Sequence, residues 1–394
     1  MKKKVIYTAL IAGVLLLNLI ARLSRPFSDF YVNKIFPLWV GSYGRVTGLF
    51  PFSVGEWLLG AQGCLMGLAA LLLVVALIAW FAKGRKRFPF RGFWRFLGNE
   101  LIFVAWLMTL NCFILYQASP FGNDLIEEAV SKCEQTDSGA EYDSFENLIY
   151  LYNDMVRECN EFCDIMERDE RGRIIYSGSV LHDGTACDMQ DKAVEAVHDL
   201  EKEFPRLKGY YSRLKALLSS DFMCQQYMLG YYFPFSLEAN YNNVAYIMNL
   251  PSTMCHELSH LRGYIFEDEA NFLGYLACVQ SDDDVFRYSG DLSVLGYIAA
   301  DINKQIDADP DKYIAIIESI GLEEPDPRIT QDDVFVLGED WDRIEEEAVI
   351  PTETVSEAAD AFIDGNLKAN GVSDGKISYS RVVRLILAYR AAKG

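Results

Sequence analysis

Three residues that lie close together in the sequence have the types and spacing of a metal-dependent hydrolytic centre. His256 and His260 are four residues apart, so a helix would place both imidazoles on one face, one turn apart. Two imidazoles placed in this way can bind a single Zn2+. Glu257, next to the first histidine, can accept a proton from a water that the metal activates. This H-E-x-x-H pattern therefore predicts zinc as a cofactor and Glu257 as a catalytic base.

The scarcity of histidine makes the pattern specific. The chain has only four histidines, and two of them fall within it. At that frequency, a chance occurrence has odds of roughly a few in a thousand. The other two, His182 and His198, have no ligand-like spacing, and we interpret them as ordinary polar residues.

A catalytic zinc needs a third protein ligand, and the acidic stretch after the motif offers one. We expect a second helix over Glu267–Val279 with carboxylates in its first turn, where they also favour the helix dipole. Glu267 shares its helical face with small or polar residues such as Asn271, whereas Glu269 lies over the apolar stripe that includes Leu276. We therefore predict Glu267 as the third ligand, with Glu269 as the alternative.

The motif helix has its own start and stop signals. Ser252 is a good N-cap residue with Pro251 just before it, and Gly263 is a good C-terminal stop. Upstream, residues 240–248 alternate like a short strand. We expect this strand either to be an edge that pairs with an extended peptide or to be an ordinary core strand.

One residue after the second helix could take part in catalysis. Tyr288 could stabilise the oxyanion of a tetrahedral intermediate, and the alternative is that it is a buried aromatic residue.

Three apolar runs near the N-terminus, residues 5–23, 57–82 and 97–116, each have the roughly 20-residue length that crosses a bilayer. The first could be a signal peptide, but it has no clear cleavage site, so we interpret it as a retained anchor. The basic stretch Lys83–Arg95 predicts a cytoplasmic loop. Residues 24–55 would then be an outer loop that packs on the membrane face or on the soluble domain, and residues 119–394 would be extracytoplasmic.

These observations predict a mainly α protein with two parts. Residues 1–118 form a membrane domain of three transmembrane helices, and residues 119–394 form a mostly helical domain with a short β element. Within the second part, the spacing of apolar residues predicts helices over 122–168 and 189–218, short helices within 301–350, and an amphipathic helix over 379–392.

The net charge limits the classes of partner that the protein can bind. A net charge of −20 argues against nucleic acid, since a phosphate backbone needs clustered Lys and Arg. We expect a peptide or protein substrate and membrane lipid instead.

The nine cysteines match no disulfide framework. Four of them either include a disulfide or are small buried residues, namely Cys133, Cys159, Cys163 and Cys187.

The motif and the residues around it resemble known metallopeptidases. His256–Asn271 is similar to the gluzincin arrangement, and Glu267-x-x-Ala270-Asn271 is similar to the Glu-x-x-Ala-Asp element of HtpX-like and prenyl-protein peptidases. Here Asn271 stands in the place of the usual Asp. More broadly, most of the chain resembles a family of bacterial membrane proteins that contains a domain of unknown function and an H-E-x-x-H motif. The resemblance implies a zincin-like metallopeptidase domain, with an amide from Asn271 beside a ligand histidine, in a multi-pass protein of the bacterial cell membrane.

Two rival functions remain. A non-catalytic sensor or scaffold could use the same zinc site structurally, and a small-solute transporter could use the three apolar helices. The intact Glu257 favours the enzyme, because a structural zinc site has no use for a base at that position. Three helices with few polar residues offer little for transport.

Overall fold

The computed structural model describes residues 2–82, 89–135, 141–372 and 381–393. Helix accounts for 72% of the chain and strand for 4%, which confirms the predicted mainly α class. The chain divides into two compact units, which we call the N-terminal unit and the C-terminal unit. The N-terminal unit contains Met1–Ala118 and Phe233–Glu238, and the C-terminal unit contains Ser119–Tyr232 and Ala239–Gly394.

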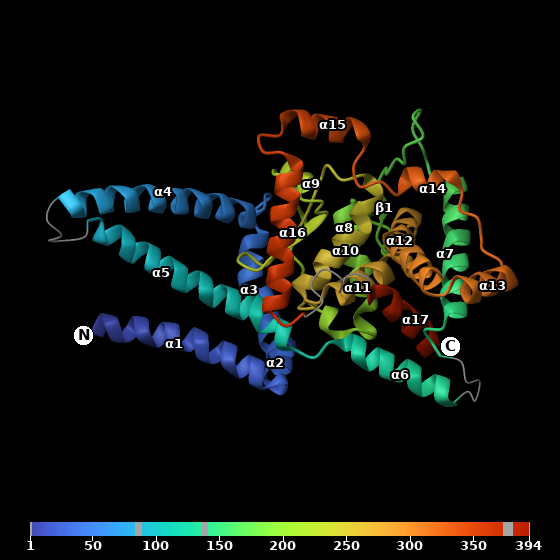
Figure 1. Ribbon diagram of the computed structural model, residues 1–394, viewed down its shortest axis with the longest axis horizontal. Helices are drawn as coiled ribbons and strands as arrows, with labels where there is room; N and C mark the ends of the chain where they lie inside the picture. Colours follow the sequence, from blue (N-terminus) through green and yellow to red (C-terminus); the bar gives the residue numbers. More distant parts are fainter. Residues whose placement is uncertain (1, 83–88, 136–140, 373–380, 394) are drawn as a thin grey trace. The chain divides into compact units, whose positions relative to one another are not determined.

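The N-terminal unit contains the three predicted apolar helices, α1 (Lys2–Leu23), α4 (Val54–Ala82) and α5 (Arg91–Met108) (Figure 1). All three are long and apolar enough to cross a membrane. The α5 helix continues through π-helical η2 (Thr109–Phe113) and a short turn, η3 (Leu115–Gln117).

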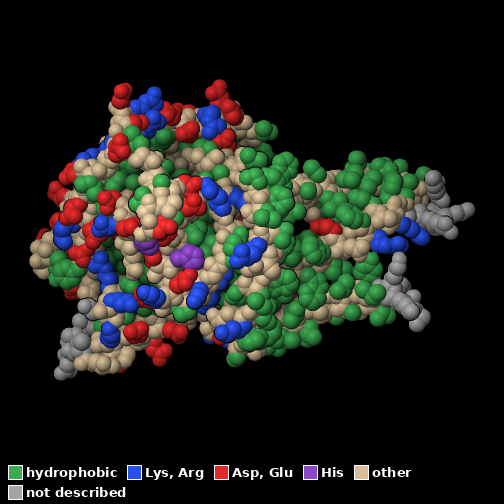
Figure 2. Space-filling view, turned by 180° about the vertical axis from the view of Figure 1, so that it is seen from behind, with side chains coloured by type: hydrophobic (Ala, Val, Ile, Leu, Met, Phe, Trp, Pro, Cys, Tyr) green, Lys and Arg blue, Asp and Glu red, His purple; other side chains and the backbone are tan. Residues whose placement is uncertain are grey.

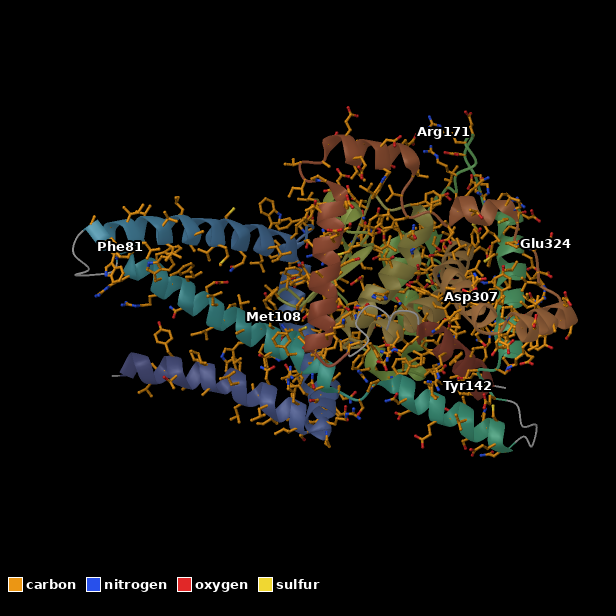
Figure 3. The ribbon with its side chains drawn as sticks, in the orientation of Figure 1. Phe81, Met108, Tyr142, Arg171, Asp307 and Glu324 are labelled. Carbon is orange, nitrogen blue, oxygen red and sulfur yellow. The ribbon has the colours of Figure 1, made fainter. Side chains whose placement is uncertain are left out.

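Many large hydrophobic side chains of these helices are exposed, above all in α1 and α4, as lipid-facing side chains would be (Figure 2). Figure 3 labels Phe81, near the end of α4, and Met108, the last residue of α5. Residues 83–88, which carry most of the predicted cytoplasmic signal, lie outside the described residues.

The predicted outer loop at residues 24–55 is instead largely helical. It forms α2 (Arg25–Phe30), π-helical η1 (Tyr31–Ile35) and α3 (Phe36–Gly48). Both α-helices have a proline in the first turn, where its missing N–H costs nothing. Val32, Phe36 and Val40 recur every four residues and are buried, which gives this segment an apolar helical face. The prolines therefore begin helices here instead of marking a loop.

The C-terminal unit consists mainly of helices. In chain order the α-helices are α6 (Phe121–Gln135), α7 (Phe145–Ile165), α8 (Met189–Asp199), α9 (Ser220–Gln225), α10 (Leu250–Leu261), α11 (Glu267–Val279), α12 (Asp284–Ala308), α13 (Pro310–Ile320), α14 (Pro327–Asp332), α15 (Gly338–Glu347), α16 (Thr352–Ala369) and α17 (Val382–Lys393). Short 3-10 turns are η4 (Leu200–Lys202), η5 (Pro205–Leu207) and η6 (Ile247–Asn249).

Most of the predicted helical segments appear in this unit. The stretch 122–168 is helical in α6 and α7, 301–350 holds several short helices, and the predicted C-terminal helix is α17. The prediction of helical structure over residues 189–218 is wrong beyond residue 207, where the last helical turn, η5, ends. Gly209 has a φ of 134°, a value that is incompatible with helical geometry and that residues with a Cβ rarely adopt.

The β structure consists of two small sheets. An antiparallel pair joins β1 (Ser179–Val180) and β2 (Ala186–Cys187). A second sheet has the strand order β3-β5-β4, formed by β3 (Lys215–Ala216), β4 (Gly230–Phe233) and β5 (Glu238–Tyr241). The β3 and β5 strands are parallel, with Lys215 opposite Asn240.

This sheet corrects the predicted strand over residues 240–248. The observed strand ends at Tyr241, because the Asn242 side chain accepts a hydrogen bond from the Val244 amide (3.0 Å) and turns the chain. In addition, β5 is the central strand, with a neighbour on each side, so it is not an edge. In the described part of the sheet, β4 is an outer strand.

The α10 helix lies in the core of the C-terminal unit, and every residue of it except His256 is buried. It packs closely against α11 at Gly274. A Cβ at that glycine would lie 3.0 Å from the Ser252 carbonyl oxygen and 3.2 Å from the His256 amide nitrogen. The absence of a side chain at Gly274 therefore lets the two helices approach closely.

Candidate metal centre

The helix that carries the motif begins earlier than the sequence predicted. Its N-cap is Asn249, and Pro251 occupies the first turn, a position that proline tolerates because no helical partner is needed for its missing N–H. Ser252 is therefore inside the helix and is not the cap. The helix ends at Leu261, and Gly263, with a φ of 86°, follows it as predicted.

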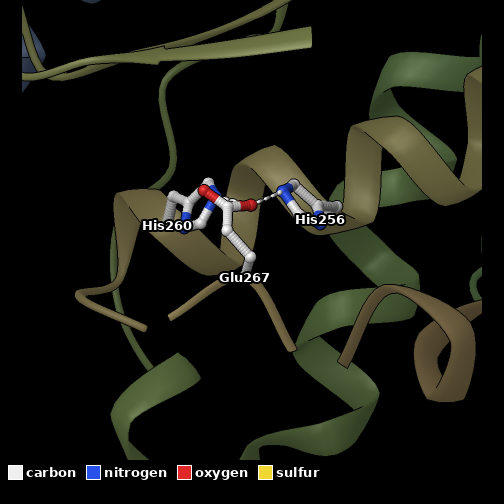
Figure 4. Close-up of side chains that lie close together, drawn as sticks. All are labelled: His256, His260 and Glu267. Atoms are coloured by element: carbon white, nitrogen blue, oxygen red, sulfur yellow. Dashed lines mark ion pairs between the residues drawn. The ribbon is translucent and has the colours of Figure 1, made fainter. Parts of the chain in front are cut away.

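His256, His260 and Glu267 converge at one point (Figure 4). The Glu267 Oε2 atom lies 3.3 Å from His256 Nε2 and 3.5 Å from His260 Nε2. The two imidazole rings are nearly perpendicular, with centroids 4.5 Å apart. Glu267 is the first residue of α11, whose observed bounds match the predicted second helix. Two adjacent helices thus direct three ligand atoms to one position.

Both histidines have a partner that orients the ring. The Tyr264 carbonyl accepts a hydrogen bond from His260 Nδ1 (2.7 Å), which leaves the Nε2 lone pair directed at the cluster. The Asn271 side chain acts on the other ring, where it favours the protonated form of His256. Such outer partners fix ligand tautomers in zinc sites. Two oriented imidazoles and one carboxylate fit the ligand set of a catalytic zinc.

The charges in the cluster also suit a cation. Burial and the neighbouring His260 lower the pKa of His256, so this ring is neutral and able to coordinate. Burial opposes ionisation of Glu267, but the charge of His260 and the hydrogen bonds of both histidines hold the pKa of the Glu267 carboxyl well below the usual range. Burial alone would lower the pKa of His260, yet Glu267 raises it to about 9. A metal would therefore compete with one proton at His260.

Glu257 lies beside the cluster and does not belong to it. Its side chain is buried, and among the described atoms its Oε2 has no hydrogen-bond partner. Burial raises the pKa of this carboxyl to about 8; the charge of His260 opposes that rise and the charge of Glu267 adds to it. A buried carboxylate with a raised pKa and an unused oxygen is suited to take up a proton near neutral pH.

The alternative third ligand, Glu269, lies elsewhere. Its carboxylate accepts a hydrogen bond from the Gly122 amide at the start of α6 (2.9 Å). Burial raises the pKa of Glu269 to about 8, although this amide opposes the shift. Glu269 therefore links α11 to α6, while Glu267 faces the histidines.

Tyr288 is not part of the cluster. Its hydroxyl donates to Asp332 Oδ2 (2.9 Å) and lies 3.4 Å from Cys163 Sγ, and its side chain is fully buried. Arg168 binds the same Asp332 carboxylate with two nitrogens. Tyr288 is thus the buried aromatic residue that we gave as the alternative, because its face of α12 packs against α7.

Two residues of β4 were not identified from the sequence. Gly230 lies against Glu257, since a Cβ at Gly230 would lie 2.5 Å from Glu257 Oε1. The Tyr232 ring lies near His260, with centroids 6.2 Å apart. The only available signal was a glycine within a short aromatic strand, which often marks the close approach of another group.

The remaining polar residues show no second catalytic arrangement in the part of the chain described here. His182 is half exposed and lies near Glu195 and Asp282. The buried Lys192 ammonium already bonds both carboxylates, so it neutralises the charge that a cation would require. In the described part of the chain, no disulfide joins the four cysteines of the predicted group, Cys133, Cys159, Cys163 and Cys187.

The fold and the cluster define a mainly helical protein with three apolar helices and a His-His-Glu group that fits zinc. The chain belongs to the family described as "Protein of unknown function (DUF3810)", whose family model matches residues 31–387. This confirms the predicted relationship to a family of unknown function, and the family description mentions neither zinc nor peptidase activity. Comparisons with curated proteins and with solved structures found no match.

Proposed function

We propose that this protein is a membrane-anchored zinc-dependent peptidase with a zincin-like C-terminal unit. The observation that carries the proposal is the position of Glu257, a buried carboxylate with an unused oxygen next to the cluster of His256, His260 and Glu267. A carboxylate in that position is what metal-assisted hydrolysis requires. The close approach of Gly230 keeps its surroundings tightly packed.

The rival proposal, a zinc-binding sensor or scaffold, is less well supported. Structural zinc sites usually have four protein ligands, whereas catalytic sites have three and an open position. Among the described residues, the group formed by His256, His260 and Glu267 contains three. A purely structural site also gains nothing from burying the uncompensated Glu257 carboxylate beside it, since such burial costs free energy.

In the proposed mechanism, His256, His260 and Glu267 hold the metal, and zinc supplies the Lewis acidity that activates water and polarises a carbonyl. Glu257 accepts the proton of the attacking water and then donates it to the leaving amine. Tyr264 and Asn271 keep the two imidazoles in the orientation that the ligands need.

The outer strand β4 offers a place for an extended peptide. The Leu229 carbonyl bonds to Asn242 on the β5 side (2.7 Å). Because the amide and carbonyl groups of successive strand residues point alternately to opposite sides, those of Gly230, the residue after Leu229, face away from β5. This edge runs past Glu257 and His260, so a peptide paired with it would lie beside the base.

The proposal also includes a location. Three membrane crossings, together with a cytoplasmic basic loop at Lys83–Arg95, would leave residues 119–394 outside the bacterial cell membrane. The partners would be a peptide or protein substrate and membrane lipid.

Replacement of Glu257 tests the proposed function. Glu257→Gln should keep zinc and the fold, since no ligand is lost, while hydrolysis of a peptide library should fall by roughly a hundred- to ten-thousand-fold. Zinc content and cleavage rates are measured on the same preparation. If wild-type protein binds zinc but shows no cleavage that depends on Glu257, the sensor proposal replaces this one.

A further inference from the structure

Three aromatic rings form a cluster at the surface of the C-terminal unit, close in the sequence to β4. The Tyr227 ring contacts Trp341 and Phe335, with centroids 5.4 Å and 5.8 Å apart, and the Trp341 and Phe335 centroids are 6.4 Å apart. Tyr227 is 60% exposed, and the other two residues are partly buried. We call these three residues the aromatic cluster. Their rings offer a surface against which a further ring can pack.

Tyr227 has a backbone conformation that favours glycine. It follows α9, and its φ is 53°. The Tyr227 amide donates to the Cys224 carbonyl (2.9 Å), and the Met228 amide donates to the Met223 carbonyl (3.1 Å). These two bonds form a Schellman motif, in which the left-handed residue is usually glycine. A tyrosine at this position is strained, and a ring that is mostly exposed offsets little of the strain by burial. Stability therefore does not explain the tyrosine, and strain of this kind often marks a functional site.

The Phe335 side of the cluster is fixed to the helix that carries the motif. Asn249, the N-cap of α10, donates from its side-chain amide to the carbonyls of Val334 (2.8 Å) and Phe335 (3.3 Å). The Phe335 carbonyl also accepts a hydrogen bond from the Tyr246 amide (2.9 Å). The start of α10 therefore sets the position of this ring.

The Trp341 side of the cluster is fixed to α9. Trp341 lies in α15, and Arg343 of the same helix binds the Asp221 carboxylate of α9 with two nitrogens, each 2.8 Å from an oxygen. A bidentate pair of this kind has a defined geometry. Polar bonds on both sides thus hold the rings in place before any ligand arrives.

The position of the cluster relative to Glu257 follows from α10. Asn249, Thr253 and Glu257 are spaced four residues apart, so they share one face of the helix. Asn249 and Glu257 are separated by about 12 Å along the helix axis. Gly230 packs on this face, since a Cβ there would lie 2.5 Å from Glu257 Oε1 and 2.8 Å from Thr253 Cγ2. The Phe335 side of the cluster and the base are therefore at the two ends of one helical face.

The chain before β4 gives a similar distance. Tyr227 precedes Gly230 by three residues, which can span at most about 11 Å. An extended peptide covers about 3.3 Å per residue. A peptide that pairs with the edge of β4 at Gly230 would therefore reach the cluster three or four residues away from the bond beside Glu257.

We infer that the aromatic cluster binds an aromatic side chain of the peptide substrate, three or four residues from the bond that is cut. The inference rests on the proposed peptidase function. The ligand is an extended peptide because the amide and carbonyl of Gly230 face away from β5, where a further strand can pair with them. An aromatic side chain is favoured because ring pairs gain free energy from their geometry in addition to the area that they bury.

The experiment uses the full-length, zinc-loaded protein in lipid nanodiscs. The probes are fluorescent peptides of about ten residues, a length that spans the base and the cluster at ~3.3 Å per residue. They are made in pairs that carry Phe or Ala at one scanned position. Cleavage gives kcat and KM for each pair. Fluorescence anisotropy gives the binding constant of each peptide to Glu257→Gln, which should bind peptides without cutting them.

We expect Phe to be preferred over Ala by roughly 5- to 20-fold at one position, three or four residues from the cut. The preference should lie in KM, because a contact that is equal in the ground state and the transition state leaves kcat unchanged. Tyr227→Ala and Trp341→Ala should reduce the preference to about twofold or less. Tyr227→Phe keeps the ring and should retain it. Tyr150→Ala, which removes an exposed ring from α7, is the control and should also retain it.

A glycine at position 227 separates binding from stability. Tyr227→Gly removes both the ring and the strain, so it should lose the preference as Tyr227→Ala does. It should nevertheless melt about 2–4 °C higher than Tyr227→Ala, which keeps the strained φ. A loss of preference in this variant therefore reports the missing ring and not a damaged fold.

The inference would be overturned if the variants without a cluster ring kept the wild-type preference, or if Tyr150→Ala lost it equally. Absence of any preference for Phe in the wild type would have the same meaning. If the wild type cuts no peptide, the proposed function fails, and anisotropy then decides the inference alone. Tighter binding of Phe peptides that is lost on addition of Tyr227→Ala would support the aromatic cluster as a binding site, whereas equal binding of both peptides would exclude it.

Discussion

Gly230 and Glu257 are so close that no side chain fits between them. A Cβ at Gly230 would lie 2.5 Å from Glu257 Oε1 and 2.8 Å from Thr253 Cγ2. The general base proposed here is therefore confined on one side by the backbone of β4, which leaves its other oxygen as the one available for a proton.

Replacement of this glycine should displace the base. Gly230→Ala should lower peptide hydrolysis by roughly 10- to 100-fold, because a shift of about 1 Å in a catalytic group has effects of that size. Zinc content should not change. Gly296→Ala is the control, since a Cβ there meets nothing within 4 Å and alanine suits a helix better than glycine. Equal activity in both variants would show that Gly230 does not set the position of Glu257.

The two acidic candidates for the third ligand should behave differently. Glu267→Ala should weaken zinc binding by more than about 100-fold, since loss of a partner that only orients a ligand already costs about 10- to 100-fold. Glu269→Ala should keep zinc but lower the free energy of unfolding by about 1–3 kcal/mol, because the buried Gly122 amide loses its acceptor. Metal analysis and thermal unfolding separate the two effects. Zinc retained in Glu267→Ala and lost in Glu269→Ala would reverse the assignment.

Tyr288 should matter for stability and not for catalysis. Tyr288→Phe removes the hydrogen bond to Asp332 and should lower the free energy of unfolding by about 1 kcal/mol, while Arg168 still pairs with that carboxylate. Peptide hydrolysis should be unchanged. Tyr150→Phe, at an exposed position, is the control. A large loss of kcat in Tyr288→Phe without a loss of stability would restore the oxyanion role.

Asp291 should make stability depend on pH. It is buried, and burial together with the nearby Glu158 raises the pKa of its carboxyl well above the usual range. The folded protein therefore keeps a proton that the unfolded chain releases, so stability is present at low pH and is lost as pH rises above the ordinary carboxyl range. Asp291→Asn cannot ionise and should melt at a higher temperature relative to wild type at pH 8 than at pH 5. The same difference at both pH values would contradict this expectation.

Reporter fusions test the proposed topology. A reporter placed after Gly84, in the basic loop, should give a cytoplasmic signal, and one placed after Gly394 should give the opposite signal. Both positions lie outside the described residues. Matching signals would exclude three crossings and would move the candidate metal centre to the cytoplasm.

Local patterns allowed much of the candidate site to be predicted. His256 and His260 share a helical face by spacing alone, and the helix beginning at Glu267 was predicted because a stop at Gly263 precedes its acidic first turn. The N-cap at Ser252 was wrong because Pro251 fits equally well inside the first helical turn. These features depend on neighbours within a few residues.

Features that depend on distant contacts were not predictable. The closeness of Gly230 to Glu257 joins a strand to a helix that follows it in the sequence, and no local pattern gives that distance. The sequence left both interpretations of Tyr288 open, because the surface that buries this residue comes from α7, far upstream. The helices within residues 24–55 were missed because proline and glycine content resembles that of a loop, whereas the buried face formed by Val32 and Phe36 decides the structure.

The placement of residues 233–238 within the N-terminal unit has a consequence for biosynthesis. The ribosome completes residues 1–118 long before it reaches residues 233–238. The nascent N-terminal unit therefore lacks the Pro234 carbonyl, which accepts a hydrogen bond from Asn111, and the Glu238 carboxylate, which accepts one from the Gly55 amide in the first turn of α4. Domains of a nascent chain generally fold as units in the order of synthesis. Here the N-terminal unit stays incomplete until its second segment, residues 233–238, has emerged from the ribosome. A truncation at Ala118 would therefore leave the apolar helices without their full set of partners. A fragment that begins at Ser119 would contain residues 233–238 without the groups of residues 1–118 that bond them.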